Sequence, residues 1–191
     1  MDIRTLTVGI VGTCCYLLRR KAGTEACVVI DPGAEAKRIL QAAEGARIEA
    51  ILLTHGHFDH IGAVRELMEA FPDARLLVHP LDAPMLGDGA LNAGRMLLGR
   101  EITAPEATGF VREGDRIMLA GISFEVLHTP GHTPGSVCYL AGGDLFTGDT
   151  LFEHGWGRTD LPGGDGAEMT RSLRRLLPLA EKYRIHPGHE G

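Results

Sequence analysis

The stretch Thr54-His55-Gly56-His57-Phe58-Asp59-His60 decides the fold of this chain, because it gathers four potential metal ligands within six positions. The apolar run 51–53 before it predicts a buried strand, and the helical spacing of large apolar residues over 59–71 predicts a helix after it. In an extended backbone His55, His57 and Asp59 project to one side, because successive side chains alternate, while His60 turns away. The ligands therefore point in two directions, which favours two metal positions over one.

The flanking sequence predicts two sheets. In the first half, periodicity and turn signals indicate helices at 34–43 and 59–71 and strands at 3–10, 14–19, 26–30, 48–54 and 75–79. Residues 80–98 are expected to be helical in pieces, and 101–113 to be irregular. The second half indicates a helix at 168–179 and strands at 116–119, 122–128, 137–140, 145–147 and 183–186. Each half supplies a sheet and covering helices, so we predict two sheets packed face to face with helices outside.

Composition limits the class of protein. With 191 residues and 44% hydrophobic content the chain can bury a substantial core, and no linker divides it, so we predict one domain over 1–191. The net charge of −6 argues against a nucleic-acid partner. No apolar run is long enough for a membrane span and the N-terminus does not resemble a signal peptide, so we expect a cytoplasmic protein without a membrane partner. The four cysteines contain no Cys-x-x-Cys pair and are expected to be buried free thiols.

Three further ligand candidates follow predicted strands in the second half. His132 is flanked by two turn-forming segments, Asp149 follows an apolar strand, and His189 follows a Pro-Gly turn. Together with the first stretch they make five histidines and two aspartates. This set is what two metal ions need if one carboxylate and one solvent oxygen are shared between them.

These motifs resemble those of the metallo-β-lactamase superfamily: Thr54 to His60, Gly131-His132-Thr133-Pro134-Gly135, Gly148-Asp149-Thr150 and Gly188-His189. Within it the chain looks most like the short glyoxalase II-like, or hydroxyacylglutathione hydrolase-like, proteins. The resemblance implies an αββα sandwich of the α/β (α+β) class and two divalent metal ions, with zinc favoured and iron or manganese as alternatives. It places His55, His57 and His132 on the first metal, Asp59, His60 and His189 on the second, and Asp149 between them.

The activity that the resemblance implies is hydrolysis of a small thioester, such as S-lactoylglutathione or a related acyl thioester, by a metal-bridging hydroxide. Two cations lower the pKa of a bridging water and polarise the acyl carbonyl, so no serine or cysteine nucleophile is required. His55, His57, Asp59 and Asp149 are the catalytic residues in this reading, because they hold those cations. A thiolate leaving group is soft and suits a zinc-type ion.

The substrate contacts depart from the family pattern. Two-domain glyoxalase II enzymes hold glutathione through a Lys and, two residues on, a Tyr, where this chain has Arg158 and Asp160. Arg158 can still bind a carboxylate through its planar fork, and Trp156 is expected to form a substrate wall. The helical substrate domain is absent, so the acyl group, the thiol and glutathione recognition stay open. His189 lies two residues from the end and would fray without metal, so we expect the natural chain to continue beyond Gly191.

Two other classes of function remain. The segment 157–160 also resembles persulfide dioxygenases of the same superfamily, which would use one iron held by His55, His132 and Asp149. Metal content and oxygen consumption distinguish that oxidoreductase from a hydrolase. A non-catalytic binding protein would be expected to lose ligands, and none of the motif ligands is missing. The sequence sets neither the native metal nor the oligomeric state.

Overall fold

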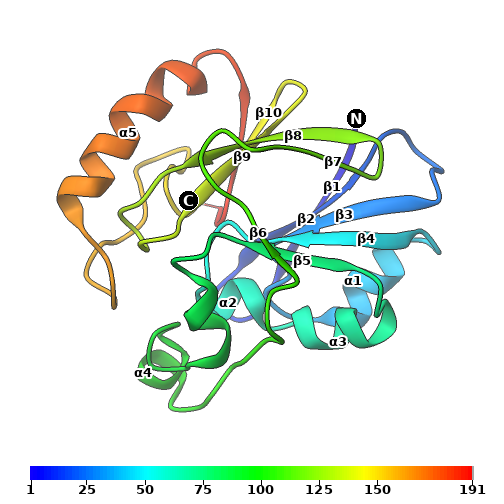
Figure 1. The fold of residues 1–191 in the computed structure, drawn as a ribbon, viewed down its shortest axis with the longest axis horizontal. Helices are drawn as coiled ribbons and strands as arrows, with labels where there is room; N and C mark the ends of the chain where they lie inside the picture. Colours follow the sequence, from blue (N-terminus) through cyan, green and yellow to red (C-terminus); the bar gives the residue numbers. More distant parts are fainter. Residues whose placement is uncertain (191) are drawn as a thin grey trace.

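The N-terminal half of the chain builds a mixed sheet with the strand order β1-β2-β3-β4-β5-β6 (Figure 1). The computed structural model describes residues 1–190. Strands β1 to β3 pair antiparallel, as the alternation in the sequence indicates, and β3 to β6 pair parallel. The strands are β1 (Asp2–Val8), β2 (Thr13–Arg19), β3 (Ala26–Ile30), β4 (Arg47–Leu52), β5 (Arg75–Val78) and β6 (Gly109–Phe110).

The C-terminal half builds a second mixed sheet with the order β11-β10-β9-β8-β7. Only β10 and β11 pair in parallel; the other pairs are antiparallel hairpins. The strands are β7 (Arg116–Leu119), β8 (Ile122–His128), β9 (Val137–Ala141), β10 (Asp144–Gly148) and β11 (Arg184–Pro187). The predicted pair of mixed sheets is therefore confirmed.

Helices cover the outer face of each sheet (Figure 1). On the first sheet lie α1 (Ala36–Ala42), α2 (Phe58–Ile61) and α3 (Val64–Ala70). On the second lies α5 (Gly166–Ala180), whose N-terminus is capped by the Asp165 carboxylate accepting from the Ala167 and Glu168 amides at 2.7 and 2.9 Å. A short 3-10 helix, η1 (Ala83–Gly87), and α4 (Gly94–Leu98) stand at one end of the sandwich.

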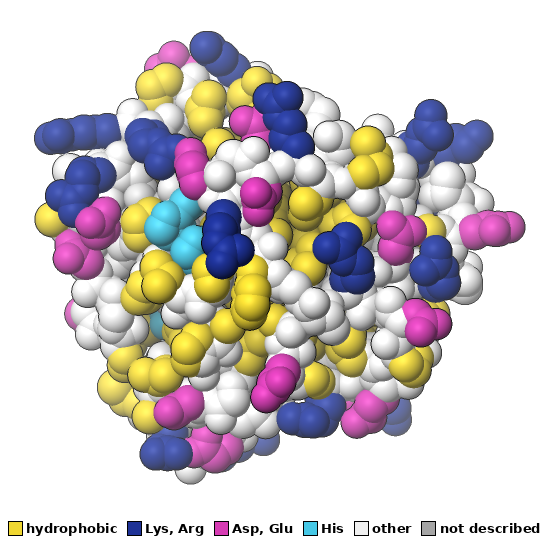
Figure 2. All heavy atoms as spheres, viewed as in Figure 1, with side chains coloured by type: hydrophobic (Ala, Val, Ile, Leu, Met, Phe, Trp, Pro, Cys, Tyr) yellow, Lys and Arg dark blue, Asp and Glu magenta, His cyan; other side chains and the backbone are white. Residues whose placement is uncertain are grey.

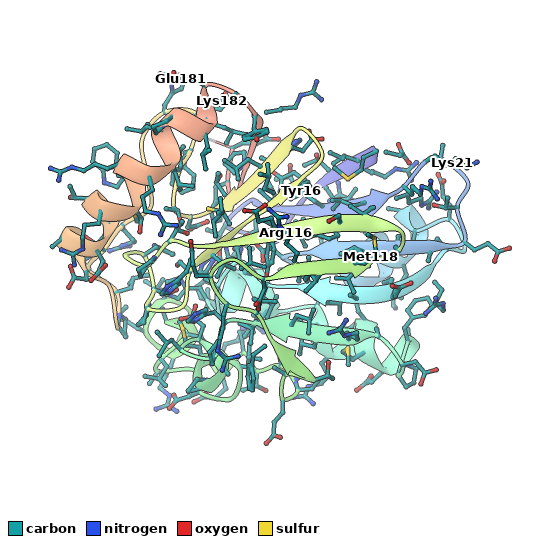
Figure 3. The ribbon with its side chains drawn as sticks, turned by 45° about the horizontal axis from the view of Figure 1, so that its top comes forward. Tyr16, Lys21, Arg116, Met118, Glu181 and Lys182 are labelled. Atoms are coloured by element: carbon teal, nitrogen blue, oxygen red, sulfur yellow. The ribbon has the colours of Figure 1, made fainter. Side chains whose placement is uncertain are left out.

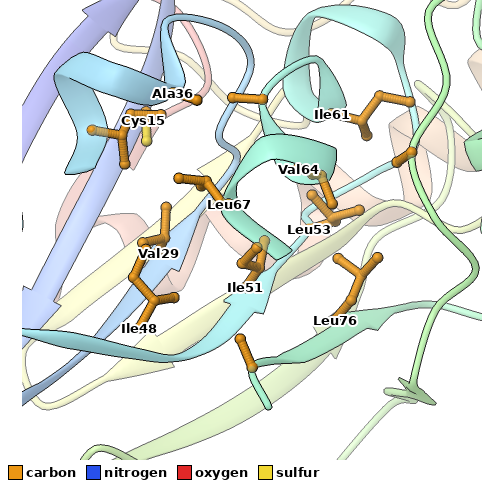
Figure 4. Close-up of a cluster of buried hydrophobic side chains, with 14 of the residues drawn as sticks. Cys15, Val29, Ala36, Ile48, Ile51, Leu53, Ile61, Val64, Leu67 and Leu76 are labelled. Carbon is orange, nitrogen blue, oxygen red and sulfur yellow. The ribbon is translucent and has the colours of Figure 1, made fainter. Parts of the chain in front are cut away.

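Three apolar layers hold the sandwich together. In β4 successive residues face opposite layers: Ile51 packs under α1 and α3 (Figure 4), while Leu52 packs between the sheets. A third layer lies between the second sheet and α5, with Leu145 and Leu176 at its centre. A strand buried on both faces reads as a continuous apolar run, and this is why the sequence before Thr54 is so strongly apolar. The predicted αββα layering follows from these contacts.

Two tyrosines tie the sheets together beside the edge where the ligand motifs lie. The Tyr16 hydroxyl of β2, labelled in Figure 3, donates to the Pro187 carbonyl at 2.6 Å. The Tyr139 hydroxyl of β9 donates to the Leu53 carbonyl at 2.8 Å. Leu53 directly precedes the segment 54–60, and Pro187 directly precedes Gly188-His189, so these bonds fix both predicted ligand segments to the opposite sheet.

One predicted helix differs from the structure. The helix expected over 59–71 is split into α2 and α3, because the turn at Pro32 and Gly33 packs into it. The Ala63 amide donates to the Pro32 carbonyl at 2.9 Å, and a Cβ added at Gly62 would lie 2.3 Å from the Gly33 carbonyl oxygen. The interruption is set by a long-range contact, which local periodicity does not contain.

Smaller features complete the fold. The segment 101–113, expected to be irregular, contains β6, whose Gly109 and Phe110 extend the sheet beside β5. All four cysteines are buried free thiols, as predicted. Over residues 1–190, none of the helices combines the length and the apolar character that crossing a membrane requires.

Candidate metal centre

The predicted ligands meet at one edge of the sandwich, where strands of both sheets end. His55 and His57 follow β4, and His132 lies in the turn between β8 and β9. Asp149 directly follows β10. His189 follows β11 and forms an isolated antiparallel bridge with Thr13 of β2. Asp59 and His60 lie in α2. The structure thus brings together all seven residues that the sequence singled out as ligands.

Three histidines form one donor group. One ring nitrogen from each of His55, His57 and His132 lies within 4.8 Å of the other two, and all three residues are buried. His57 Nδ1 and His132 Nε2 are 2.8 Å apart. Their rings meet nearly edge to face, with interplanar angles of 80–89° among the three. Nitrogens that converge in this way leave one common point for a cation.

A second donor group lies beside the first and contains Asp59, His60 and His189. His189 Nε2 is 3.2 Å from Asp59 Oδ2 and 3.3 Å from His60 Nε2. Asp149 stands between the groups. Its Oδ2 is 3.4 Å from both His132 Nε2 and His189 Nε2, and its Oδ1 is 3.4 Å from His60 Nε2. A single carboxylate therefore reaches members of both groups.

Unsatisfied polar atoms show that the donors fit divalent cations. His55 Nε2, His57 Nε2 and Asp149 Oδ1 are buried and have no hydrogen-bond partner among residues 1–190. A buried polar atom left unpaired costs about 1–3 kcal/mol, which ligation through that atom would remove, as at His55 Nε2 and Asp149 Oδ1. Burial also lowers the pKa of His57 to about 3. The ring is then neutral at physiological pH, which is the form that ligates a metal.

The second group carries opposite charges in the absence of metal. Burial alone would raise the pKa of Asp59, but the adjacent His60 and His189 lower it to about 2. Burial alone would lower the pKa of His189, but hydrogen bonds with the Asp149 and Asp59 carboxylates raise it to about 9. Both carboxylates are thus ionised and available as ligands.

Asp31 orients the ligand His60 and was not identified as a site residue from the sequence. Its carboxylate accepts hydrogen bonds from the Thr54 amide and hydroxyl at 2.8 and 2.6 Å and lies 3.0 Å from His60 Nδ1. This contact directs His60 Nε2 towards Asp59 and Asp149. The segment Asp31-Pro32-Gly33 after β3 was the available signal: it indicated a turn and the start of the family resemblance, but no role for the Asp31 side chain.

Asp82 connects the two segments that carry the three histidines. Its buried carboxylate accepts from the Gly56 amide at 3.0 Å, from the Thr133 hydroxyl at 2.7 Å and from the Gly135 amide at 2.7 Å. Gly56 lies between His55 and His57, and Thr133 follows His132. The sequence placed Asp82 only in a broken helical segment, because its partners are more than 25 positions away on either side.

A cavity of about 480 Å³ opens over the ligands. Ligand side chains form its floor, and its walls are mainly apolar, with Val11, Leu97 and Leu161 among them. Arg158 lines the wall and forms a bidentate pair with Asp160 at 2.6 and 2.7 Å. Trp156 is 61% exposed and is not part of the cavity wall that the described residues form.

Comparisons with known proteins agree with this geometry. The family model described as Metallo-beta-lactamase superfamily matches residues 8–189. The hydroxyacylglutathione hydrolase GloC of Haemophilus influenzae is 37% identical over 84% of this chain and 78% of its own length. The crystal structure of BLEG-1 B3 metallo-beta-lactamase matches with a TM-score of 0.93 and 36% identity, over 100% of this chain and 92% of that one. The crystal structure of TTHA1623 in a di-iron-bound form matches with a TM-score of 0.85 and 41% identity, over 98% of this chain and 92% of that one.

Proposed function

The chain belongs to the metallo-beta-lactamase superfamily, and on this premise we propose that it is a binuclear metallohydrolase that cleaves small acyl thioesters. The observation that carries the proposal is the position of Asp149, within 3.4 Å of nitrogens of both donor groups and with one oxygen unpaired. The similarity to a hydroxyacylglutathione hydrolase supports the thioester as substrate.

Each part of the site has a role in this reaction. One cation would be held by His55, His57 and His132. The other would be held by Asp59, His60 and His189, and Asp149 would contact both cations. When bound, the two cations would supply an acidified water as the nucleophile and polarisation of the acyl carbonyl. Asp31 and Asp82 keep the ligand segments in place before the cations bind. The apolar walls of the cavity exclude bulk water and hold the acyl or thiol group against the ligands.

The first test is metal content per chain on protein purified without added metal, together with thiol release from S-lactoylglutathione and from simpler acyl thioesters. We expect two metals per chain and turnover. Zinc is our preferred ion, while the di-iron form of TTHA1623 makes iron a second candidate. One iron per chain, oxygen uptake with glutathione persulfide and no thioester cleavage would instead support the persulfide dioxygenase.

Asp149→Ala tests the bridging assignment directly. Loss of the shared carboxylate should remove at least one metal and reduce thioester hydrolysis by at least roughly 100-fold, because metal ligands and their supports act together. The near-ultraviolet circular dichroism of the variant controls for loss of fold. A folded Asp149→Ala protein with two metals and full activity would contradict the assignment.

A further inference from the structure

A second cavity, of about 250 Å³, adjoins the one over the ligands. The two cavities share Val11, Phe58, Asp59 and Leu98 in their walls. The two cavities therefore meet at these side chains, and a ligand of the metal site that extended along Phe58 and Leu98 would lead towards the second cavity. In Figure 2 hydrophobic side chains gather at the lower left of this face, where Figure 1 shows α4. Apart from Asp59, which belongs to the second donor group, the shared residues are apolar, so Val11, Phe58 and Leu98 suit a hydrocarbon segment.

Each cavity is lined by one arginine, and the two differ in their partners. Arg158, in the first cavity, is held by Asp160 in a bidentate pair. Arg100, in the second cavity, has no ion-pair partner among residues 1–190. Glu35 lines the same cavity, but its carboxylate already accepts from the Gly9 amide at 2.8 Å and pairs with Arg38 at 3.0 Å. Arg100 is thus the cation that remains available to a ligand.

The backbone around Arg100 is fixed on both sides. Before it, α4 ends at Gly99 in the left-handed conformation, a glycine cap that turns the chain back. After it, the Ile102 carbonyl accepts from the side-chain amide of Asn92, which is fully buried, at 2.8 Å. The same amide donates to the Met85 carbonyl at 2.9 Å. A guanidinium on such an anchored segment loses less freedom on binding than one on a free loop.

We propose that Arg100 binds a carboxylate of the substrate at a position remote from the scissile thioester. The apolar part of the substrate between these two groups lies along Val11, Phe58 and Leu98. The inference rests on the proposed thioesterase function and adds a substrate class to it: acyl thioesters with a terminal carboxylate. Arginine suits this ligand because its planar fork matches a carboxylate in two hydrogen bonds.

Paired thioesters test the proposal on the metal-loaded enzyme. In the acyl arm, hexanoyl and adipoyl thioesters of N-acetylcysteamine differ only in a terminal methyl or carboxylate. In the thiol arm, S-acetyl propanethiol is compared with S-acetyl 3-mercaptopropanoate, which again differ only in a terminal methyl or carboxylate. We expect the carboxylate member of one arm to have a kcat/KM at least about fivefold higher, mainly through KM. The arm that shows the preference tells which side of the thioester faces Arg100.

Variants assign the preference to Arg100. Arg100→Ala should reduce the kcat/KM ratio between carboxylate and methyl substrates to about one, and Arg100→Lys should retain part of it. Arg95→Ala is the matched control, because Arg95 lies on α4 five positions away and is paired with Glu101. It should leave the ratio at the wild-type value. An equal ratio in Arg100→Ala and wild type, or no preference in either arm, would overturn the proposal.

A binding measurement separates this proposal from the proposed function. A thiol anchors on a soft metal, so ω-mercaptoalkanoates and alkanethiols of equal length probe Arg100 without turnover. Isothermal titration calorimetry on metal-loaded protein should give a Kd at least about fivefold lower for the carboxylate, and Arg100→Ala should abolish the difference. If no thioester is cleaved but this difference persists, the thioesterase assignment fails and the Arg100 site stands. If thioesters are cleaved and the difference is absent, the Arg100 site fails.

Discussion

Substitution of Asp82 should weaken metal binding at one of the two proposed metal positions more than at the other. It joins the segment of His55 and His57 to that of His132 through three accepted hydrogen bonds. In Asp82→Asn one acceptor oxygen becomes an amide donor that faces another donor. We expect the affinity of the three-histidine position to fall roughly 10- to 100-fold, while the Asp59-His60-His189 position changes less.

Competition with a chelator, monitored by the visible spectrum of cobalt-loaded protein, measures both affinities. Asp144→Asn is the control, because Asp144 pairs with His186 at 2.8 Å, outside both donor groups. Asp31→Asn should show the opposite pattern, since Asp31 contacts His60. Equal losses at both positions in Asp82→Asn would mean that Asp82 supports the fold in general.

His79 should make stability depend on pH. Its ring stacks on His128 with centroids 4.2 Å apart, and burial, followed by the charges of His128 and Arg112, lowers its pKa to about 4. Between pH 6.5 and 4 the unfolded chain therefore binds a proton that the folded chain does not, so the folded state loses stability as the pH falls through this range.

Urea unfolding of metal-free wild type and His79→Asn at pH 7.5 and pH 5 measures this effect. The free energy of unfolding of wild type relative to the variant should be lower at pH 5 than at pH 7.5. The comparison with the variant cancels the other titrating groups. A difference that does not change with pH would show that His79 is not responsible.

At the scale of elements, the sequence predicted those helices and strands whose positions depend on local hydrophobic periodicity. Strands β2 to β4 alternate between two apolar layers, so their positions follow from periodicity. The end of α2 does not follow from periodicity, because the Pro32–Gly33 turn that interrupts the helix is distant in sequence. The same distinction holds in the site. The ligands were visible as motifs, whereas Asp31, Asp82 and Arg100 gain their roles only from the fold.

Gly33→Ala tests the contact between this turn and α2. A Cβ at Gly33 would lie 1.6 Å from the Asp59 carbonyl oxygen, so the turn and the helix must separate. We expect a loss of about 2–3 kcal/mol in the free energy of unfolding and weaker metal binding at the position that contains Asp59. Gly143→Ala is the matched control, because a Cβ there meets nothing within 4 Å. Comparable stability of the two variants would contradict the contact.

At the scale of the whole molecule, the candidate metal centre joins the two halves of the chain. Its ligands follow β4 in the first sheet and β10 and β11 in the second, while each sheet has its own apolar layer under its helices. Each metal ion that binds only the folded state adds about 4 kcal/mol of stability when free metal exceeds its Kd roughly 1,000-fold. For a chain of this size that corresponds to roughly 8–16 °C in Tm.

Metal removal should therefore lower Tm by at least this amount and loosen one edge of the molecule. We expect hydrogen exchange after chelation to increase in 54–60, 131–135 and 188–190, because these segments lose their common ligand. The amides of β3 and β4 should stay protected, since both strands are buried between apolar layers on either face. Readdition of metal should restore both Tm and protection. If protection fell equally in β3 and β4, the metal centre would support the entire fold rather than the junction between the sheets at this edge.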